Sequence, residues 1–290
     1  VREDTLDDLM NPMRLDYLAT ILADRQNSPI NRQFTPICYF HGMMLWASQW
    51  HPAMGRWIGR AAAAPPAWLV AAVGLVGIST ILFFWLGKPR YLAAVGTSVM
   101  AVGAVGMVLQ VVLILIFQIL AGFAYLQLAL IIALFMAGLA VGTLAVRAGM
   151  RAGQQEARAT SWLVWAQGGV TVLPLLLVLF VSSSAEGMRQ SLSTTAVAWL
   201  VTLASLLSGV LGGSHFALAA LASAAAGARV ERTGGYLYAV DLAGAAGGAL
   251  VAGLYMLPLF GIATTLLLSS LISGVCLVAL LRRPAIAGRG

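Results

Sequence analysis

The amino-acid sequence predicts an all-α protein, a polytopic transmembrane helix bundle of about seven spans that follows a short interfacial N-terminal region. Hydrophobic residues make up 60% of the 290 residues and charged residues only 9%, whereas soluble domains carry about 25% charged residues. From Ala67 onward the apolar residues form long runs. Such runs cross a bilayer as helices, because every backbone polar group must find a partner without water.

Residues 1–60 are more polar than the remainder and form the first predicted region. Within it, Leu15–Arg25 has apolar residues at helical spacing and predicts a short helix. Pro29 and Pro36 then interrupt any helix. A stretch rich in methionine and tryptophan follows, and we expect its indole rings to lie at the level of the lipid headgroups, at Trp46, Trp50 and Trp57.

Residues 61–290 form the second predicted region, a transmembrane helical domain. Each candidate span meets the requirement of about 20 apolar residues for a hydrocarbon core about 30 Å thick. Pro258 and Gly261 predict a turn between the last two spans. The seven candidate spans are 67–87, 93–122, 126–146, 161–181, 195–221, 236–258 and 262–281.

The charge distribution predicts an orientation. Alternating spans place three basic residues on one side, namely Arg56, Arg60 and Arg189. The other side receives ten, namely Lys88, Arg90, Arg147, Arg151, Arg158, Arg229, Arg232, Arg282, Arg283 and Arg289. This bias predicts that the second side is cytoplasmic and that residues 1–60 face outward. The basic residues are scattered over short loops, which favours contact with anionic lipid and argues against nucleic acid as a partner.

Small residues recur four positions apart within the spans, at Gly138 and Gly142, Gly209 and Gly213, and Gly244 and Gly248. Such pairs allow two helix backbones to approach closely. We expect them to pack helices within one bundle, with homodimerisation as the alternative.

Asp241 is the acidic residue that lies inside a predicted span. Counted from the start of that span it is about 7 Å deep, in the first turns of the helix, where the helix dipole favours an anion. One interpretation is therefore structural, with Asp241 paired to Arg229 or Arg232 in the preceding loop. The alternatives are a site for a cationic ligand, such as a polyamine or a proton, and a protonated carboxyl that only packs.

His215 lies in the predicted fifth span, at a depth similar to that of Asp241 in the next. A His–Asp pair inside a membrane is a candidate functional site. The alternative is an interhelical hydrogen bond of about 0.6 kcal/mol.

The glutamines Gln110 and Gln118 are eight residues apart, so they share one helix face. Together with Gln127 and Gln167 they predict contacts between helices more readily than a pathway. The cysteines Cys38 and Cys276 predict no disulfide framework. Neither His41 nor His51 has the neighbours of a metal ligand, so no metal site is expected.

Three passages resemble integral membrane spermidine synthase-like proteins. "INRQFTPICYFHGMMLWASQW" (Ile30–Trp50) is similar to the end of the synthase domain in that family. "GMVLQVVLILIFQILAGFAYLQLALIIALFMAGLAVGT" (Gly106–Thr143) resembles its paired-helix signature. "YLYAVDLAGAAGGALVAGLYMLPLFGI" (Tyr236–Ile262) resembles its late membrane segment. The three passages follow the family's order over most of the chain.

The resemblance implies an aminopropyltransferase domain joined to membrane helices. The glycine-rich loop and acidic residues with which that domain would hold decarboxylated S-adenosylmethionine and a polyamine do not occur in this sequence. Residues 1–50 would be only the tail of the domain. Gln33 and Gln110 stand where the family has acidic residues, which disfavours a cation relay through either position.

We therefore expect the chain to be the C-terminal membrane portion of a longer spermidine synthase-like protein of the bacterial inner membrane. It would anchor the synthase domain, without a cofactor or catalysis of its own. Its partners would be the bilayer and its own upstream domain or a soluble partner. Two alternatives remain, a small-molecule or polyamine transporter and a membrane scaffold subunit of a larger complex.

Overall fold

The structure, a computed structural model, describes residues 11–23, 37–51, 53, 56, 59–60, 91–121, 125–150, 155–183, 193–225 and 230–281. It divides into a unit of residues 1–32 and a unit of residues 33–290. The described part of the first unit is helix α2 (Pro12–Ala23). This helix begins where the Met13 amide donates a hydrogen bond to Asn11 Oδ1 at 3.0 Å, with Pro12 in the first helical position, where no amide hydrogen is needed.

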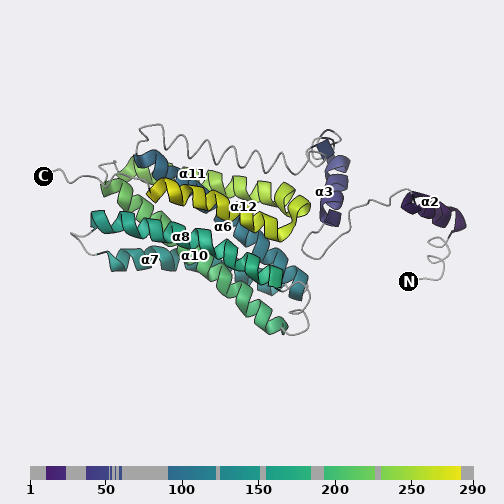
Figure 1. Cartoon of the computed structure of the whole chain (residues 1–290), viewed down its shortest axis with the longest axis horizontal. Coiled ribbons are helices and arrows are strands. Elements are labelled where there is room, and N and C mark those ends of the chain that lie inside the picture. The colour runs from purple at the N-terminus through teal and green to yellow at the C-terminus, as the bar shows by residue number, and fades with distance from the viewer. Residues whose placement is uncertain are drawn as a thin grey trace. The chain divides into compact units, whose positions relative to one another are not determined.

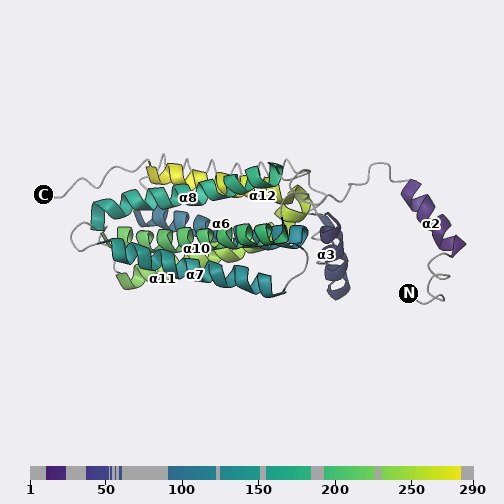
Figure 2. The ribbon, with the colours of Figure 1, turned by 90° about the horizontal axis from the view of Figure 1, so that it is seen from below.

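All regular structure described in the second unit is helical. Its elements are α3 (Ile37–Trp50), α6 (Tyr91–Ala121), α7 (Tyr125–Gly149), α8 (Gln155–Ser183), α10 (Thr194–Ala225), α11 (Val230–Val251), the π-helix η1 (Ala252–Met256) and α12 (Leu257–Leu281). The helices from α6 to α12 lie lengthwise beside one another as a bundle (Figures 1 and 2). The predicted all-α fold is therefore confirmed for the described residues.

Helices α6 and α10 are the centre of the bundle. Helix α6 packs against α8, α10, α11 and α12, and α10 packs against α6, α7, α8 and α11. Helix α6 is the most buried of the apolar helices and α7 the least. Large apolar side chains are exposed on the outer faces, among them Trp165, Leu144 and Leu271. A helix that is apolar on its buried and its outer face is typical of a membrane bundle.

Five described helical stretches are long and apolar enough to span a membrane, so the structure supports a membrane protein. They are Leu92–Leu120, Tyr125–Gly149, Arg158–Ser182, Thr195–Ala225 and Arg232–Leu281. The count of about seven spans is not confirmed, and the predicted span 67–87 lies outside the described residues.

The last stretch contains the two predicted spans 236–258 and 262–281. Its 50 residues would extend about 75 Å as one straight helix, far beyond a hydrocarbon core of about 30 Å. The backbone leaves helical geometry at Gly261, with φ 76° and ψ 178°, and the chain reverses direction there (Figure 1). A positive φ of this size is easily adopted only by glycine, so the turn expected at Pro258 and Gly261 is confirmed.

The described arginines of the bundle gather at one end, which we call the basic end. Helix α7 ends there with Arg147, and α8 and α11 begin there with Arg158 and Arg232 (Figures 1 and 2). Helix α3 lies at the opposite end and contacts α12. The predicted grouping of these three arginines agrees with this arrangement, and the cytoplasmic location of the basic end stays a prediction.

Helices α7 and α10 are held together by paired glycines. A methyl group added at Gly138 would come within 3.0 Å of Gly209 Cα, and one added at Gly209 would run into the Phe135 carbonyl oxygen. Gly142 and Gly213 meet backbone atoms of the partner helix in the same way. The predicted close approach is confirmed, and these faces are occupied within one chain.

Helices α6 and α11 are held together by the third pair of glycines, Gly244 and Gly248. Gly244 lies against the Met100 carbonyl and Gly248 against the Ala104 carbonyl, so a Cβ at either position would meet the α6 backbone. The bundle therefore contains two tight helix pairs, α7–α10 and α6–α11.

Replacement of Gly209 by alanine should loosen the α7–α10 pair. The added methyl would meet the α7 backbone, and overpacking of this kind costs about 1–3 kcal/mol. We expect Gly209→Ala to lower the free energy of unfolding by that amount in mixed detergent–lipid micelles, measured by circular dichroism during denaturation with sodium dodecyl sulfate.

Gly247→Ala is the matched control, because a methyl there meets nothing within 4 Å. Its stability should stay unchanged or rise by up to about 1 kcal/mol through the higher helix propensity of alanine. Equal losses in both variants would contradict the glycine packing.

Candidate functional site

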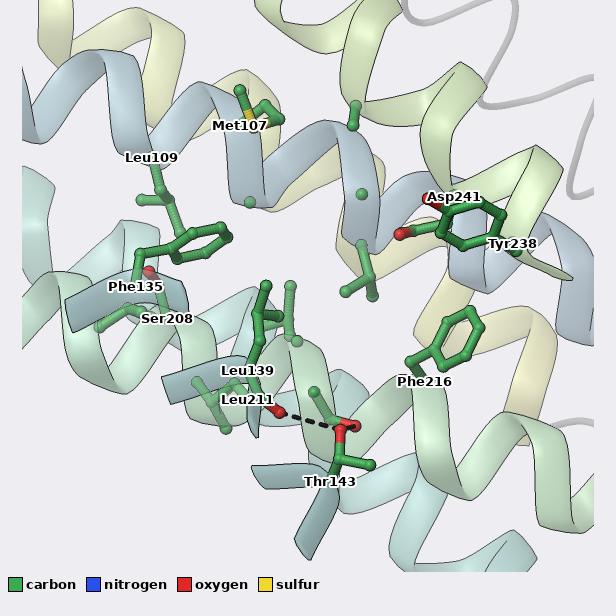
Figure 3. Close-up of a pocket in the computed structure, with 18 residues that line it drawn as sticks. Met107, Leu109, Phe135, Leu139, Thr143, Ser208, Leu211, Phe216, Tyr238 and Asp241 are labelled. Carbon is green, nitrogen blue, oxygen red and sulfur yellow. Dashed lines mark hydrogen bonds between the residues drawn. The ribbon is translucent and has the colours of Figure 1, made fainter. Parts of the chain in front are cut away.

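A cavity of about 310 Å³ lies among α6, α7, α8, α10 and α11. Most of its wall is apolar, as at Leu109, Phe135 and Phe216 (Figure 3). This volume is at the lower end of the range of about 300–1,000 Å³ that is usual for small-molecule sites. The few polar side chains of the wall are Thr143, Ser208, Tyr238 and Asp241.

Two glycines of α6, Gly103 and Gly106, line the cavity, and each lacks a side chain that would fill part of it. At Gly106 an added methyl would meet no atom within 4 Å, so the space beside it is open. At Gly103 an added methyl would lie 2.6 Å from Asp241 Oδ1. The carboxylate of Asp241 therefore rests directly against the backbone of α6, where any side chain on residue 103 would displace it.

Asp241 is half-buried and points into the cavity next to Tyr238 (Figure 3). No described residue forms a hydrogen bond or an ion pair with its carboxylate. Helix α11 begins at Val230, so Asp241 lies about 16 Å along the helix. The expected position in the first turns of the helix, and with it the expected stabilisation by the helix dipole, is wrong, because the dipole acts only within the first turn. The expected depth of about 7 Å within the span stays a prediction.

The expected pairing of Asp241 with Arg232 is also not present. Arg232 is exposed, and nine residues of α-helix are about two and a half turns, which places the two side chains on opposite faces of α11. Arg229, the other expected partner, lies outside the described residues. Among the described residues, the carboxylate thus faces the cavity without a counter-charge.

His215 is fully buried in α10, and neither ring nitrogen has a hydrogen-bond partner. It does not line the cavity and makes no hydrogen bond with Asp241. The expected interhelical hydrogen bond of His215 is therefore wrong for the described residues, and a functional His–Asp pair stays a hypothesis. His215 follows Leu211, which does line the cavity, by one helical turn in the direction of the basic end.

Gln167, like His215, lies about one helical turn from a residue of the cavity wall. It is on α8, about one turn before Val170. It is fully buried, and its Nε2 donates to the backbone oxygen of Ser273 at 3.0 Å and to Ser273 Oγ at 3.0 Å. Its Oε1 has no partner. Thr171 and Ser270 complete this contact, because Ser270 Oγ donates to the Thr171 carbonyl at 2.8 Å. The network joins α8 to α12 beside the cavity.

Gln110 joins α6 to α10. Its Nε2 donates to Ser205 Oγ at 2.9 Å and lies 3.4 Å from Ser208 Oγ. Ser205 Oγ in turn lies 2.7 Å from the Ile131 carbonyl of α7. Gln118 is half-buried, and no described residue bonds to its side chain. The two glutamines therefore do not form a common site, and Gln110 acts as the expected contact between helices.

Gln127 makes a further contact between helices, since its Nε2 lies 3.3 Å from Thr202 Oγ1 of α10. The sequence interpretation did not single out two pairs of serines, Ser205 with Ser208 and Ser270 with Ser273. Three of them accept hydrogen bonds from Gln110 or Gln167, and Ser270 donates to the Thr171 carbonyl. Their spacing of three residues in each pair places two hydroxyl groups on one helix face, and this was the available signal.

The described residues contain no group of three His, Cys, Asp or Glu that could hold a metal ion. They also contain no disulfide, and Cys276 is buried in α12. The side chain of His41 lies outside the described residues, and His51 is exposed. The candidate site is thus a mostly apolar cavity with the carboxylate of Asp241 on its wall.

A comparison with known proteins found no matching family model, no matching curated protein and no matching solved structure.

Replacement of His215 by leucine tests whether this buried ring has a bonding role. A buried polar group without a partner costs about 1–3 kcal/mol, so we expect His215→Leu to leave the free energy of unfolding unchanged or to raise it by about 1 kcal/mol. Denaturation in mixed micelles measures the change.

Gln110→Leu is the comparison, because Gln110 has partners that would lose their hydrogen bond. We expect it to lower stability by about 0.6–1.7 kcal/mol. A loss in His215→Leu as large as that in Gln110→Leu would contradict the absence of a partner for the ring.

Proposed function

We propose that this chain is a non-catalytic membrane domain whose cavity binds an organic cation at Asp241. The observation that carries the proposal is a carboxylate with no bonding partner among the described residues, on the wall of a mostly apolar cavity of about 310 Å³. A charged group inside a bilayer costs about 2.5–3.5 kcal/mol. A cation bound beside it offsets this cost, because opposite charges attract strongly where water is excluded.

The residue types that line the cavity support binding of a cation rather than of an anion or a neutral ligand. Among the described lining residues none is basic, and Asp241 is the only acidic one. Tyr238 and Phe216 place aromatic rings on the wall of the same cavity as Asp241 (Figure 3). Aromatic faces attract ammonium groups by about 0.5–2 kcal/mol, so these two rings add to the preference for a cation.

An anchoring role is the second part of the proposal, and α3 supports it. This helix lies within the passage Ile30–Trp50 that resembles the end of a synthase domain, and it contacts α12 of the bundle. Its Trp46 and Trp50 are exposed, with ring centroids 5.7 Å apart, as suits side chains at a membrane surface. In this proposal α3 joins an upstream synthase-type domain, or a soluble partner, to a membrane domain in the bacterial inner membrane.

The proposal assigns the chain no cofactor. It therefore predicts that the purified chain, supplied with putrescine and decarboxylated S-adenosylmethionine, releases no methylthioadenosine above a protein-free control. Chromatography with mass detection measures this product. Release that grows in proportion to the amount of chain would refute the non-catalytic role.

Asp241→Asn tests cation binding directly. The variant keeps the side-chain shape and removes the charge, so the melting temperature without ligand should stay equal or rise. A bound amine at about 100 times its Kd stabilises a protein by about 2.7 kcal/mol, and this stabilisation should be lost in the variant. Thermal denaturation in detergent with putrescine, spermidine or dodecylamine measures it.

Asp16→Asn is the matched control, because it removes the same charge from α2, outside the bundle unit. It should retain the full amine-dependent rise in melting temperature. If every amine stabilises the wild type and Asp241→Asn equally, the proposed function is wrong.

A further inference from the structure

The cavity lies between two helices that do not pack substantially against each other. Helix α7 packs on α10 and α11 packs on α6, but α7 and α11 share no comparable contact. Both nevertheless contribute to the cavity wall, through Thr143 on α7 and Tyr238 on α11. Thr143 is exposed and Tyr238 is 59% exposed. The exposure of these two lining residues, on helices that do not pack together, points to an opening on the side of the bundle between α7 and α11.

The outer surface near this opening is apolar. Leu144 and Met136 of α7 and Leu242 of α11 are each exposed by 50% or more of their surface. These side chains lie in the stretches that are long and apolar enough to span a membrane, where they face the hydrocarbon of the bilayer. A ligand that uses this opening arrives from the lipid phase, so it must partition into lipid.

The cavity has one charged end and one apolar end. Asp241 and Tyr238 lie on one side of it, and Leu109 and Phe135 lie on the other (Figure 3). Along α6, Leu109 is six residues beyond Gly103, the residue that contacts Asp241, which is about 9 Å of helix. A ligand that fills the cavity thus has a cationic end and an apolar body.

A polyamine fits this arrangement poorly. Putrescine and spermidine carry more than one positive charge, whereas the lining residues include a single carboxylate. Each additional ammonium would lie unpaired among apolar side chains, and an unpaired buried charge is strongly unfavourable. One carboxylate matches one ammonium group.

We propose that the cavity binds an amphiphilic monoamine that enters laterally from the bilayer between α7 and α11. Its ammonium group lies against Asp241 and its apolar chain extends along α6 to Leu109 and Phe135. This inference rests on the proposed cation binding and specifies the class of ligand and the route by which it arrives.

Photolabelling in phosphatidylcholine nanodiscs tests the inference. The probe is dodecylamine with a diazirine at carbon 7, so that the reactive group lies about as far from the ammonium nitrogen as Leu109 lies from Gly103 along α6. Mass spectrometry of peptides maps the adducts. We expect adducts at Leu109 and Phe135, at the apolar end of the cavity. Excess dodecylamine should suppress them, whereas dodecanol, which lacks the charge, and spermidine should not.

Two variants define the site. Asp241→Asn should reduce labelling of the cavity about tenfold, which corresponds to the loss of one favourable charge contact. Gly106→Leu should reduce it by a similar factor, because its side chain enters the open space beside residue 106. Gly247→Leu is matched to it, since Gly247 also has nothing within 4 Å of an added Cβ but does not line the cavity. This control should label like the wild type.

The outcomes separate this inference from the proposed function. Adducts confined to outward-facing positions such as Leu144 and Leu242, and unchanged in Asp241→Asn, overturn the inference. Suppression by spermidine and not by dodecylamine also overturns the ligand class, while cation binding at Asp241 stands. If no amine acts through Asp241 in labelling or in thermal denaturation, both are wrong.

Discussion

Close contact of helix backbones at glycine residues is the constraint on which the rest of the bundle depends. Gly138 and Gly209 bring α7 and α10 together, and Gly244 and Gly248 bring α11 onto α6. Within a bilayer the hydrophobic effect does not drive helices together, so close van der Waals packing and hydrogen bonds between helices must do so. The polar contacts supplement the glycines, as Gln110 does by joining α6 to Ser205 of α10.

The cavity follows from this arrangement. Two tight pairs, each held by small residues, leave a space where the outer members α7 and α11 do not meet. Gly103 and Gly106 widen that space on the α6 side, and Gly103 also seats the carboxylate of Asp241 against the backbone. Glycine therefore has two effects in this bundle. Where the backbone of another helix lies opposite it, glycine allows the two helices to pack closely, and where no atom lies opposite it, glycine leaves space for the cavity.

Much of the fold could be predicted from the sequence, because long apolar runs and glycines four residues apart are local signals. The site could be predicted only in part. The run of apolar residues predicted a span from 236, whereas α11 already begins at Val230, since hydropathy marks the edge of the lipid and not the end of a helix. Asp241 was therefore singled out from the sequence but placed too near the helix start, with Arg229 or Arg232 as its expected partner.

No local sequence pattern predicted which residues would line the cavity together with Asp241. Phe135, Phe216 and Tyr238 come from three helices, and which way each helix turns about its axis decides whether its rings face inward. Helices that are apolar on all sides give almost no indication of that rotation. His215 shows the same difficulty, because equal depth on consecutive helices did not bring its ring to the carboxylate.

The reversal at Gly261 has a consequence for how the protein reaches its membrane. No charged residue occurs between Asp241 and Arg282, so the turn between η1 and the rest of α12 carries no charge that could hold it on one side during synthesis. Basic residues, which set the orientation of membrane helices, flank this pair of helices only near the start of α11 and after α12. We therefore expect the two helices to insert together as one hairpin, whose tip is formed by a glycine and a proline instead of a polar loop.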